Sequence, residues 1–257
     1  MEYLDFLFPP KYSVPCPGTE TEWVRPIVKS QYILLLLKLI SIHGTKNPSH
    51  ESEVMAKTRI WRDWDSQELG PESKVMLETD AWQGKDEELL KSEDADQDYF
   101  KSLFSVRSLA EETGISKSQI SLSLNRCYEI GLAKIDRKSL LPKVNTQALM
   151  EFISYGIRYV FPIKAGEITR GIATSFAAPA LQGQLMTSGD FPPVWPDARG
   201  NTKGVAVEPL HRGVVIAIKH DPELYAMLAL TDAIRMGQPR ERKLATEKLN
   251  RLFEELK

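Results

Sequence analysis

One stretch of the sequence, residues 104–132, constrains the fold more than any other. It reads FSVRSLAEETGISKSQISLSLNRCYEIGL, a pattern that is typical of two short helices joined by a tight turn. Gly114 permits the left-handed backbone that such a turn requires. Leu109 and Ala110 supply the apolar and the small side chain at which two helices cross. The sequence therefore predicts a helix-turn-helix whose first helix spans residues 106–113.

The second helix of this pair is expected directly after the turn. Ile115 should fill the turn, Ser116 should cap the helix, and Ile120 and Leu124 should seat it on the first helix. The side chains left facing outward are mostly polar or basic: Lys117, Ser118, Gln119, Ser121, Leu122, Asn125 and Arg126. Hydroxyls and amides read base edges in the major groove, and cations bind phosphates. Gln119 is the predicted base reader, because a glutamine can bond adenine at two points.

A basic hairpin is predicted immediately after this helix. The residues GLAKIDRKSLLPKV indicate two short strands around a tip at Arg137, Lys138 and Ser139. A helix-turn-helix followed by such a hairpin is a winged helix, whose wing reaches phosphates or the minor groove. Between positions 116 and 144, six basic residues stand against two acidic ones. The predicted wing contacts are Lys134, Arg137, Lys138 and Lys143.

The segment GISKSQISLSLNRCYEIGL resembles the recognition helix of bacterial winged-helix regulators of the MarR-like kind, and the resemblance covers Phe104 to Lys143. It implies a DNA-binding domain. The DNA-facing positions of the family fall here on Ser116, Lys117, Ser118, Gln119 and Ser121, and its wing tip falls on Arg137 and Lys138.

Two positions depart from the family pattern. Leu122 stands where the family often has an arginine that contacts DNA, which puts the strength or specificity of groove contact in doubt. Cys127 stands where the family has a core leucine, and we interpret it as a core residue rather than a redox switch. Winged helices also serve as protein-docking or RNA-binding modules, and either role is an alternative to DNA binding.

The charge of the chain is strongly segregated. Residues 49–98 hold 15 acidic against 6 basic residues, a net charge of −9, which leaves +7 for the rest of a chain whose total is −2. The total argues against a polyanionic partner, but the segments reverse that argument. The acidic block is interpreted as a solvated insertion that ends in a loop over Ser92 to Asp98. The alternative is a surface that docks a partner or competes with DNA.

The predicted organisation is mainly helical and has four parts. Residues 1–48 form an arm and a buried helix, 49–103 the acidic insertion, 104–160 the winged helix-turn-helix, and 161–257 a loop-rich region that ends in helices. The first helix, Pro26 to Gly44, is apolar all round, so it lies either inside its own domain or in a subunit interface. Within the insertion, a helix that starts at Ser49 should place Trp64 on its apolar face.

The C-terminal part has weaker signals. A short strand is predicted at Gly204 to Glu208, whereas Gly213 to Lys219 suits either a strand or a helical turn. Helices are predicted from Asp221 to Met236 and from Pro239 to Lys257. The segments GEITRGIATSFAAPAL, PPVWPD, VEPL and DAIRMGQPRERKLA are similar to tails of uncharacterised bacterial winged-helix proteins, some of which occur in toxin-antitoxin or phage-defence settings.

The sequence offers no catalytic motif. GxSxG, Walker A and GxGxxG patterns are absent, the four histidines lack metal-ligand spacing, and the two cysteines form no disulfide framework. We therefore expect no enzyme, no cofactor and no metal. The best polar set could instead bind a small effector or a protein, with Trp195 in the pocket wall; it comprises Glu167, Arg170, Asp197, Arg199 and His211.

These patterns predict a sequence-specific DNA-binding regulator, a repressor that acts as a homodimer on double-stranded DNA. The predicted dimer interface is formed by helices Pro26 to His43 and Pro239 to Lys257, because both carry apolar stripes. The alternative is a nucleic-acid-binding or adaptor subunit of a defence or toxin-antitoxin system, with a protein partner at the C-terminal region or at the acidic insertion. Without a signal peptide or a membrane-spanning apolar run, a cytoplasmic location is expected.

Overall fold

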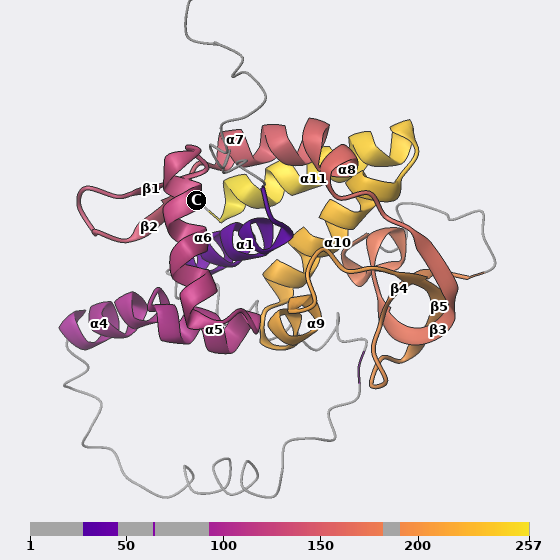
Figure 1. Ribbon diagram of the computed structural model, residues 1–257, viewed down its shortest axis with the longest axis horizontal. Helices are drawn as coiled ribbons and strands as arrows, with labels where there is room; N and C mark the ends of the chain where they lie inside the picture. Colours follow the sequence, from indigo (N-terminus) through magenta and orange to yellow (C-terminus); the bar gives the residue numbers. More distant parts are fainter. Residues whose placement is uncertain (1–27, 46–63, 65–92, 182–190, 257) are drawn as a thin grey trace, which may run out of the picture.

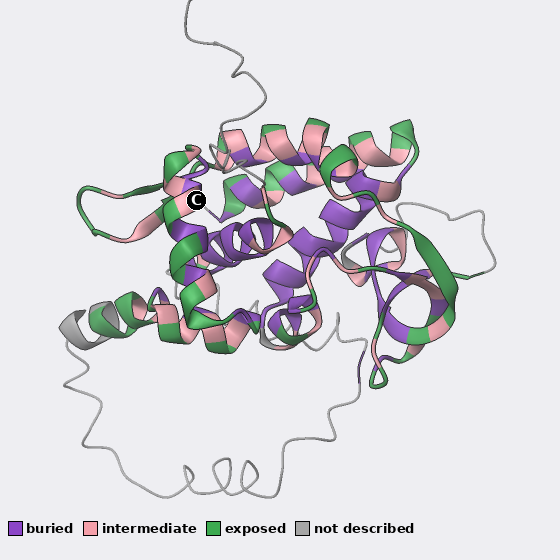
Figure 2. Ribbon diagram, in the orientation of Figure 1, coloured by how far each residue is buried: buried purple, intermediate pink, exposed green. Residues whose placement is uncertain are grey.

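The computed structural model describes residues 28–45, 64, 93–181 and 191–256. The chain is mainly helical, and two helices lie at its centre, α1 (Ser30–Gly44) and α10 (Pro222–Met236) (Figure 1). Residues 32–42 of α1 and residues 222–235 of α10 are all buried, and Figure 2 shows both helices enclosed by the other elements. Helices that are apolar all round need such complete cover.

The burial of α1 is provided by its own chain. The helix begins at Ser30, later than predicted, and Pro26 lies outside the described residues. It packs on α10, on the strand β2 (Pro142–Val144), and on two further helices, α5 (Val106–Thr113) and α6 (Lys117–Glu129). The helix therefore lies inside its own domain, which was the first alternative, and not in a subunit interface.

The apolar stripe of α11 (Pro239–Glu255) is also covered. Its residues Ala245, Leu249 and Phe253 are buried, and the helix packs on α10. The predicted dimer interface assumed that α1 and α11 carry apolar surface left over for a partner subunit. This premise was wrong, because both apolar surfaces are buried inside one chain. Burial of these stripes against α10 removes the same apolar area from water that a partner subunit would have covered.

The two short helices and the hairpin predicted for residues 104–144 lie where the sequence places them. Helices α5 and α6 are joined through Gly114, whose φ of 66° is the left-handed conformation expected there. The hairpin follows as β1 (Ala133–Ile135) antiparallel to β2, with Lys134 directly opposite Lys143. Ile115, Ile120 and Leu124 are buried, as predicted.

The end of the acidic insertion forms a helix rather than the expected loop. Helix α4 (Glu93–Leu103) includes most of the segment predicted to be irregular. Its last turns are held because Phe100 and Leu103 pack against the core, and this tertiary burial outweighs the low apolar content of the segment. The remaining insertion, residues 49–63 and 65–92, lies outside the described residues, and so does the helix predicted from Ser49.

Trp64 is the exception within the insertion. It was expected on a helix face, but it forms an isolated antiparallel bridge with Gly200 and is buried. Its ring meets the ring of Tyr225 edge-on, with centroids 6.0 Å apart.

A small sheet occupies the region that was predicted to be loop-rich. The strands β3 (Ala165–Ala173), β4 (Pro193–Pro196) and β5 (Thr202–Val207) each pair with the other two. Strand β3 is antiparallel to both of its partners, whereas β4 and β5 are parallel, so the sheet closes on itself. The short strand predicted at Gly204 to Glu208 corresponds to β5; β3 and β4 were missed.

The glycines of this region explain the error. Glycine and proline usually interrupt regular structure, but here glycine allows neighbouring backbones to approach closely. A Cβ atom on Gly204 would collide with the carbonyl oxygen of Pro192, and one on Gly171 with that of Trp195.

The remaining elements connect these units. The predicted helix from Thr146 is present as α7 (Thr146–Glu151), the π-helical turn η1 (Phe152–Gly156) and α8 (Ile157–Val160). After β3 come the 3₁₀ turns η2 (Ser175–Ala177) and η3 (Pro179–Leu181). The ambiguous segment is helical, with α9 (Val214–Ala217) followed by η4 (Ile218–His220). Within the described part of the chain, every helix is too short or too polar to cross a membrane.

Candidate nucleic-acid interface

The side of α6 that points away from the core is polar. Ser118, Ser121, Leu122 and Asn125 are exposed and follow the helical spacing i, i+3, i+4 and i+7, which places them on one face. We call these four residues the outer face of α6. The opposite side of the helix is buried through Ile120, Ser123, Leu124 and Cys127. The sequence therefore positioned this face correctly relative to the core.

Exposed cations flank the outer face of α6. Lys117 lies in the first turn of the helix, and the hairpin carries four more exposed basic side chains: Lys134, Arg137, Lys138 and Lys143. Among the described residues, none of these five cations forms an ion pair with an acidic side chain. Like charges placed opposite each other on paired strands repel, as Lys134 and Lys143 do. A bound anion would relieve this repulsion.

The tip of the hairpin is held in one shape by Asp136. Its carboxylate accepts hydrogen bonds from the backbone N–H of Ser139 at 2.9 Å, from the Ser139 hydroxyl at 2.9 Å and from the backbone N–H of Lys138 at 3.2 Å. These bonds, above all those from Ser139, hold the pKa of Asp136 below its ordinary value. An ionised Asp136 thus shapes the turn that carries Arg137 and Lys138.

The base of the hairpin is anchored on α1. Nε2 of His43 lies 2.9 Å from the carbonyl oxygen of Pro142 in β2, and the His43 ring packs on Phe104 at a centroid distance of 4.7 Å. Ala133 and Val144 are buried at the inner end of the two strands. The hairpin and α6 therefore rest on the same central helix, which keeps their relative position constant.

Two predicted contact residues are engaged within the chain. Arg126 is half-buried and forms an ion pair with Glu129 on the next turn. Gln119 is also half-buried, and its Oε1 accepts a hydrogen bond from Nε2 of Gln31 at 3.0 Å. The simple expectation of a Gln119 side chain with both polar atoms open to adenine was therefore wrong.

Ser116 occupies the N-cap position of α6, as predicted, but its side chain makes no capping bond. Its hydroxyl oxygen instead lies 3.4 Å from that of Ser118. Both hydroxyls are exposed, so they remain accessible at the start of the helix.

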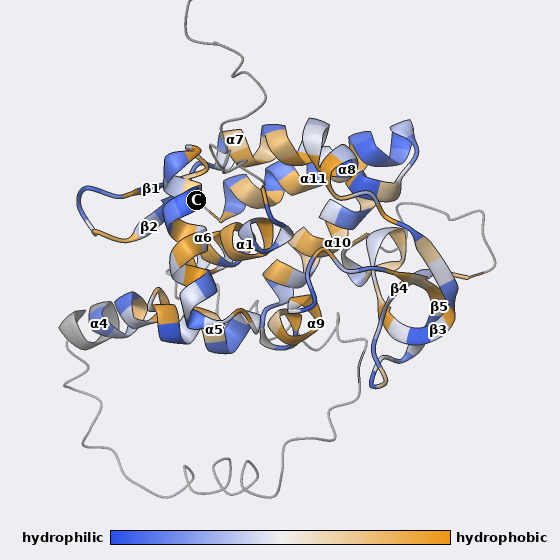
Figure 3. Cartoon of the chain, in the orientation of Figure 1, coloured by the Kyte–Doolittle hydropathy of each residue, from blue (hydrophilic) through white to orange (hydrophobic). Residues whose placement is uncertain are grey.

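The same surface also carries exposed apolar side chains. Leu122 on α6 is 60% exposed, Ile135 at the end of β1 is 55% exposed, and Leu140 beside the hairpin tip is 74% exposed. The sequence pattern singled out only Leu122. In Figure 3 the hairpin is largely hydrophilic with a short hydrophobic stretch.

An ionic cluster joins α1, α5 and the start of α10. Lys38 of α1 pairs with Glu112 of α5 and with Asp221, whose Oδ2 is 2.8 Å from the ammonium nitrogen. The hydroxyl of Ser41 and the backbone N–H of Leu224 both donate to Oδ1 of Asp221, at 2.7 and 2.8 Å. Sequence reasoning missed this cluster, although a lone lysine inside an apolar run was its visible signal.

Burial alone would lower the pKa of Lys38. The charges of Asp221 and Glu112, with their hydrogen bonds, outweigh burial and raise the pKa above its ordinary value of 10.5. Lys38 is therefore charged, and it joins α5, α1 and the first turn of α10.

Trp195, which was expected with a polar set in the wall of a C-terminal pocket, lies in the core. Trp195 is 1% exposed, and its indole N–H donates to Oδ2 of Asp232 at 2.7 Å, so Trp195 is a core residue and not a pocket wall. Asp232 also accepts from Thr174 at 3.1 Å and pairs with Arg235 at 2.6 Å.

The other members of the set have local structural contacts. Asp197 accepts from the backbone N–H of Arg199 at 2.7 Å, Arg170 donates to the carbonyl of Gly200, and Nδ1 of His211 accepts from the backbone N–H of Gly213 at 3.0 Å. Glu167 is exposed on β3. In the described part of the chain, no three His, Cys, Asp or Glu side chains gather as metal ligands would.

Cys127 is a core residue, as predicted. Its side chain is fully buried on the inner side of α6, and burial raises the pKa of its thiol to about 12. A thiol with so high a pKa holds almost no thiolate near neutral pH, and the thiolate is the reactive form.

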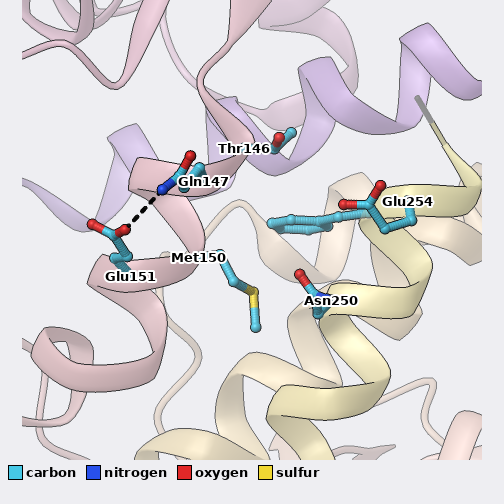
Figure 4. A pocket seen from close by; sticks show the side chains of 7 residues that line it. Thr146, Gln147, Met150, Glu151, Asn250 and Glu254 are labelled. Carbon is cyan, nitrogen blue, oxygen red and sulfur yellow. Dashed lines mark hydrogen bonds between the residues drawn. The ribbon is translucent and has the colours of Figure 1, made fainter.

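A cavity of about 260 Å³ lies between α7 and α11, away from the outer face of α6. Figure 4 shows it lined by Thr146, Gln147, Met150, Glu151, Asn250 and Glu254, with Gln147 bonded to Glu151 at 3.3 Å. It contains none of the residues predicted to contact a ligand.

Comparisons with protein-family models, with curated proteins and with solved structures found no match for this chain.

Proposed function

We propose that this chain binds double-stranded DNA through a winged helix, with α6 in the major groove and the β1–β2 hairpin as the wing on the flanking backbone. One observation carries the proposal. Five exposed cations that form no salt bridge among the described residues flank a row of mostly polar side chains on a single helix. Polar groups on a helix read base edges, while cations beside them bind phosphates.

The positions of the side chains assign base contacts to α6 and phosphate contacts to the hairpin. Ser118, Ser121 and Asn125 on the outer face of α6 meet base edges with their hydroxyl and amide groups. The hairpin cations bind phosphates, which makes affinity fall as salt rises. Arg126 contributes less than an unpaired arginine, because Glu129 neutralises much of its charge. No catalytic step is part of the proposal.

A regulatory role as a repressor follows if the bound site overlaps a promoter. One α6 reaches too few base pairs for genomic specificity, so two copies are proposed to bind a pseudo-palindrome with half-sites about 34–36 Å apart. The dimer contact must use surfaces other than the apolar faces of α1 and α11, which are buried within the subunit. Sedimentation with and without DNA measures this stoichiometry.

The test is selection from random duplexes, followed by affinity measurements across a salt series. Replacement of Lys134, Arg137, Lys138 and Lys143 by alanine should flatten the slope of log K against log salt by up to about 3.6, or about 0.9 for each lost phosphate contact. The matched control replaces Arg240, Lys243, Lys248 and Arg251 of α11, which changes the total charge equally. Equal effects of the two variants would contradict a specific role for the hairpin.

A second candidate function is an adaptor that docks a protein partner within a defence or toxin-antitoxin assembly. The exposed side chains of Leu122, Ile135 and Leu140 favour it, since apolar groups on a polar face often mark protein contacts. The variant Leu122→Arg separates the two. On a DNA-binding face it should tighten duplex binding and steepen the salt slope by about 0.9; on a protein-docking face it should leave duplex binding unchanged.

A further inference from the structure

The side-chain amide of Gln31 connects α1 to the outer part of α6. Its Nε2 donates to Oε1 of Gln119 at 3.0 Å and to the hydroxyl oxygen of Ser123 at 2.9 Å. Gln31 lies in the first turn of α1, and Ser123 is fully buried one turn after Gln119. The contact therefore joins the central helix to the predicted base reader.

The direction of this network follows from the hydroxyl of Ser123. That hydroxyl donates its only proton to the backbone carbonyl of Gln119 at 2.6 Å. Its oxygen can then only accept from Gln31, so the atom of Gln31 that faces Ser123 must be the amide nitrogen. The same nitrogen reaches Gln119, and the atom of Gln119 that meets it must be the oxygen.

The remaining atom of the Gln119 amide is its nitrogen. Because Oε1 is turned toward α1, Nε2 is the polar atom left for a ligand, and within the described residues it donates to no other group. We propose that Gln31 determines base specificity by holding Oε1 of Gln119 toward α1, so that Gln119 presents its donor Nε2 to the base edges and is directed to edges that accept.

Guanine fits this donor best. Its O6 and N7 both accept in the major groove, whereas adenine presents one acceptor beside a donor. A glutamine bonds adenine at two points only when its oxygen and its nitrogen face the same base edge. Here Gln31 fills one lone pair of Oε1 and holds that oxygen toward α1. Gln31 is thus a positioning residue, and it inverts the adenine preference that Gln119 would have alone.

This inference rests on the proposed DNA binding. The test below can reject the role of Gln31 and leave DNA binding intact. In the motif selected by the wild-type chain, the position read by Gln119 is the one whose preference disappears in Gln119→Ala. Guanine is expected there by about tenfold over adenine. Gln31→Met, which frees Oε1 of Gln119, should remove this preference or reverse it toward adenine.

Two further variants exclude a merely structural effect. Gln31→Glu accepts from Nε2 of Gln119 and turns Oε1 outward, so the preference should move to adenine or cytosine, whose exocyclic amines donate. Gln31→Lys keeps a donor at this position and should keep guanine. Gln147→Met, the same substitution on an exposed site of α7, is the matched control and should change nothing.

Each outcome is decisive. A guanine preference that inverts in Gln31→Glu and survives in Gln31→Lys supports the inference. A motif that requires Gln119 but is unchanged in every Gln31 variant overturns it and leaves DNA binding intact. If the wild-type chain binds no duplex at all, both the inference and the proposed function are overturned.

Discussion

Two regions of the molecule differ in how their charged side chains are placed: one exposes them outside salt bridges, and the other buries them in salt bridges. On α6 and the hairpin, Lys117, Lys134 and Lys143 are exposed and form no salt bridge among the described residues. In the core around α1 and α10, Lys38 and Arg235 are buried, and each pairs with carboxylates. The first arrangement leaves charge available to a ligand, whereas the second uses charge to join helices.

Desolvation explains the difference. A buried ion loses the stabilisation of water and persists only when partners replace it. Asp232 has three donors around its carboxylate, from Thr174, Trp195 and Arg235. An exposed lysine keeps its hydration and needs no partner, so its position can be set by the ligand it meets. The buried charges should therefore matter for stability and the exposed ones for binding.

The largest effect on stability is expected for Asp232→Asn. The change keeps the shape of the side chain but leaves Arg235 as a buried charge without its carboxylate, which should cost about 3–5 kcal/mol of unfolding free energy. Urea unfolding measures the loss. The matched control is Glu111→Gln, which removes the exposed pair with Arg107 on α5 and should have no measurable effect. If both variants unfold like the wild type, the core pair has no structural role.

A smaller effect is expected for Lys38→Met. It leaves Glu112 and Asp221 without their cation, and because Glu112 is partly exposed the loss should be about 2 kcal/mol. The expected pH dependence follows from the raised pKa of Lys38. The stabilisation is present in full below the ordinary pKa of 10.5 and is lost as pH rises through the higher folded value.

The urea series is therefore repeated at rising pH. The difference in unfolding free energy between the wild type and Lys38→Met should be constant near neutrality and should narrow above pH 10.5. Lys243→Met, on the exposed side of α11, serves as the control and should follow the wild type throughout. If this difference stays constant into strong alkali, the charge of Lys38 contributes nothing to the stability of the fold.

The smallest effect should be seen at Cys127. With Cys16 replaced by serine, the folded chain should resist alkylation at neutral pH, because a thiol pKa of about 12 leaves very little thiolate. Labelling should become rapid once urea unfolds the protein, and mass spectrometry reads both states. Rapid labelling of the folded chain would mean that the inner side of α6 opens, and the contrast between the two faces of this helix would fail.

The helix pair α5 and α6 was predictable because its requirements are local. Gly114 is needed for a positive φ, Ile120 and Leu124 repeat at helical spacing, and Asp221 followed by a proline marks the start of α10. Such signals depend only on residues close together in the chain. The outer face of α6 followed from them, since the positions that are not buried must point outward.

The closed sheet of β3, β4 and β5 was not predictable in the same way. Its strands contain glycine and proline at positions that locally indicate loops, and only the distant partner strand makes those residues favourable. The helix α4 was missed for the related reason that Phe100 and Leu103 are stabilised by the core rather than by their own segment.

Local signals in the sequence account for the mainly helical composition, the turn at Gly114, the order of α5, α6 and the hairpin, and the side of α6 that faces outward. Long-range packing sets which apolar helix is buried within one subunit, which charges are paired, and which atom of Gln119 is held by α1. The reason is physical. Helix periodicity and turn geometry are encoded over a few neighbouring residues, whereas burial and side-chain hydrogen bonds depend on segments that meet only in the folded chain.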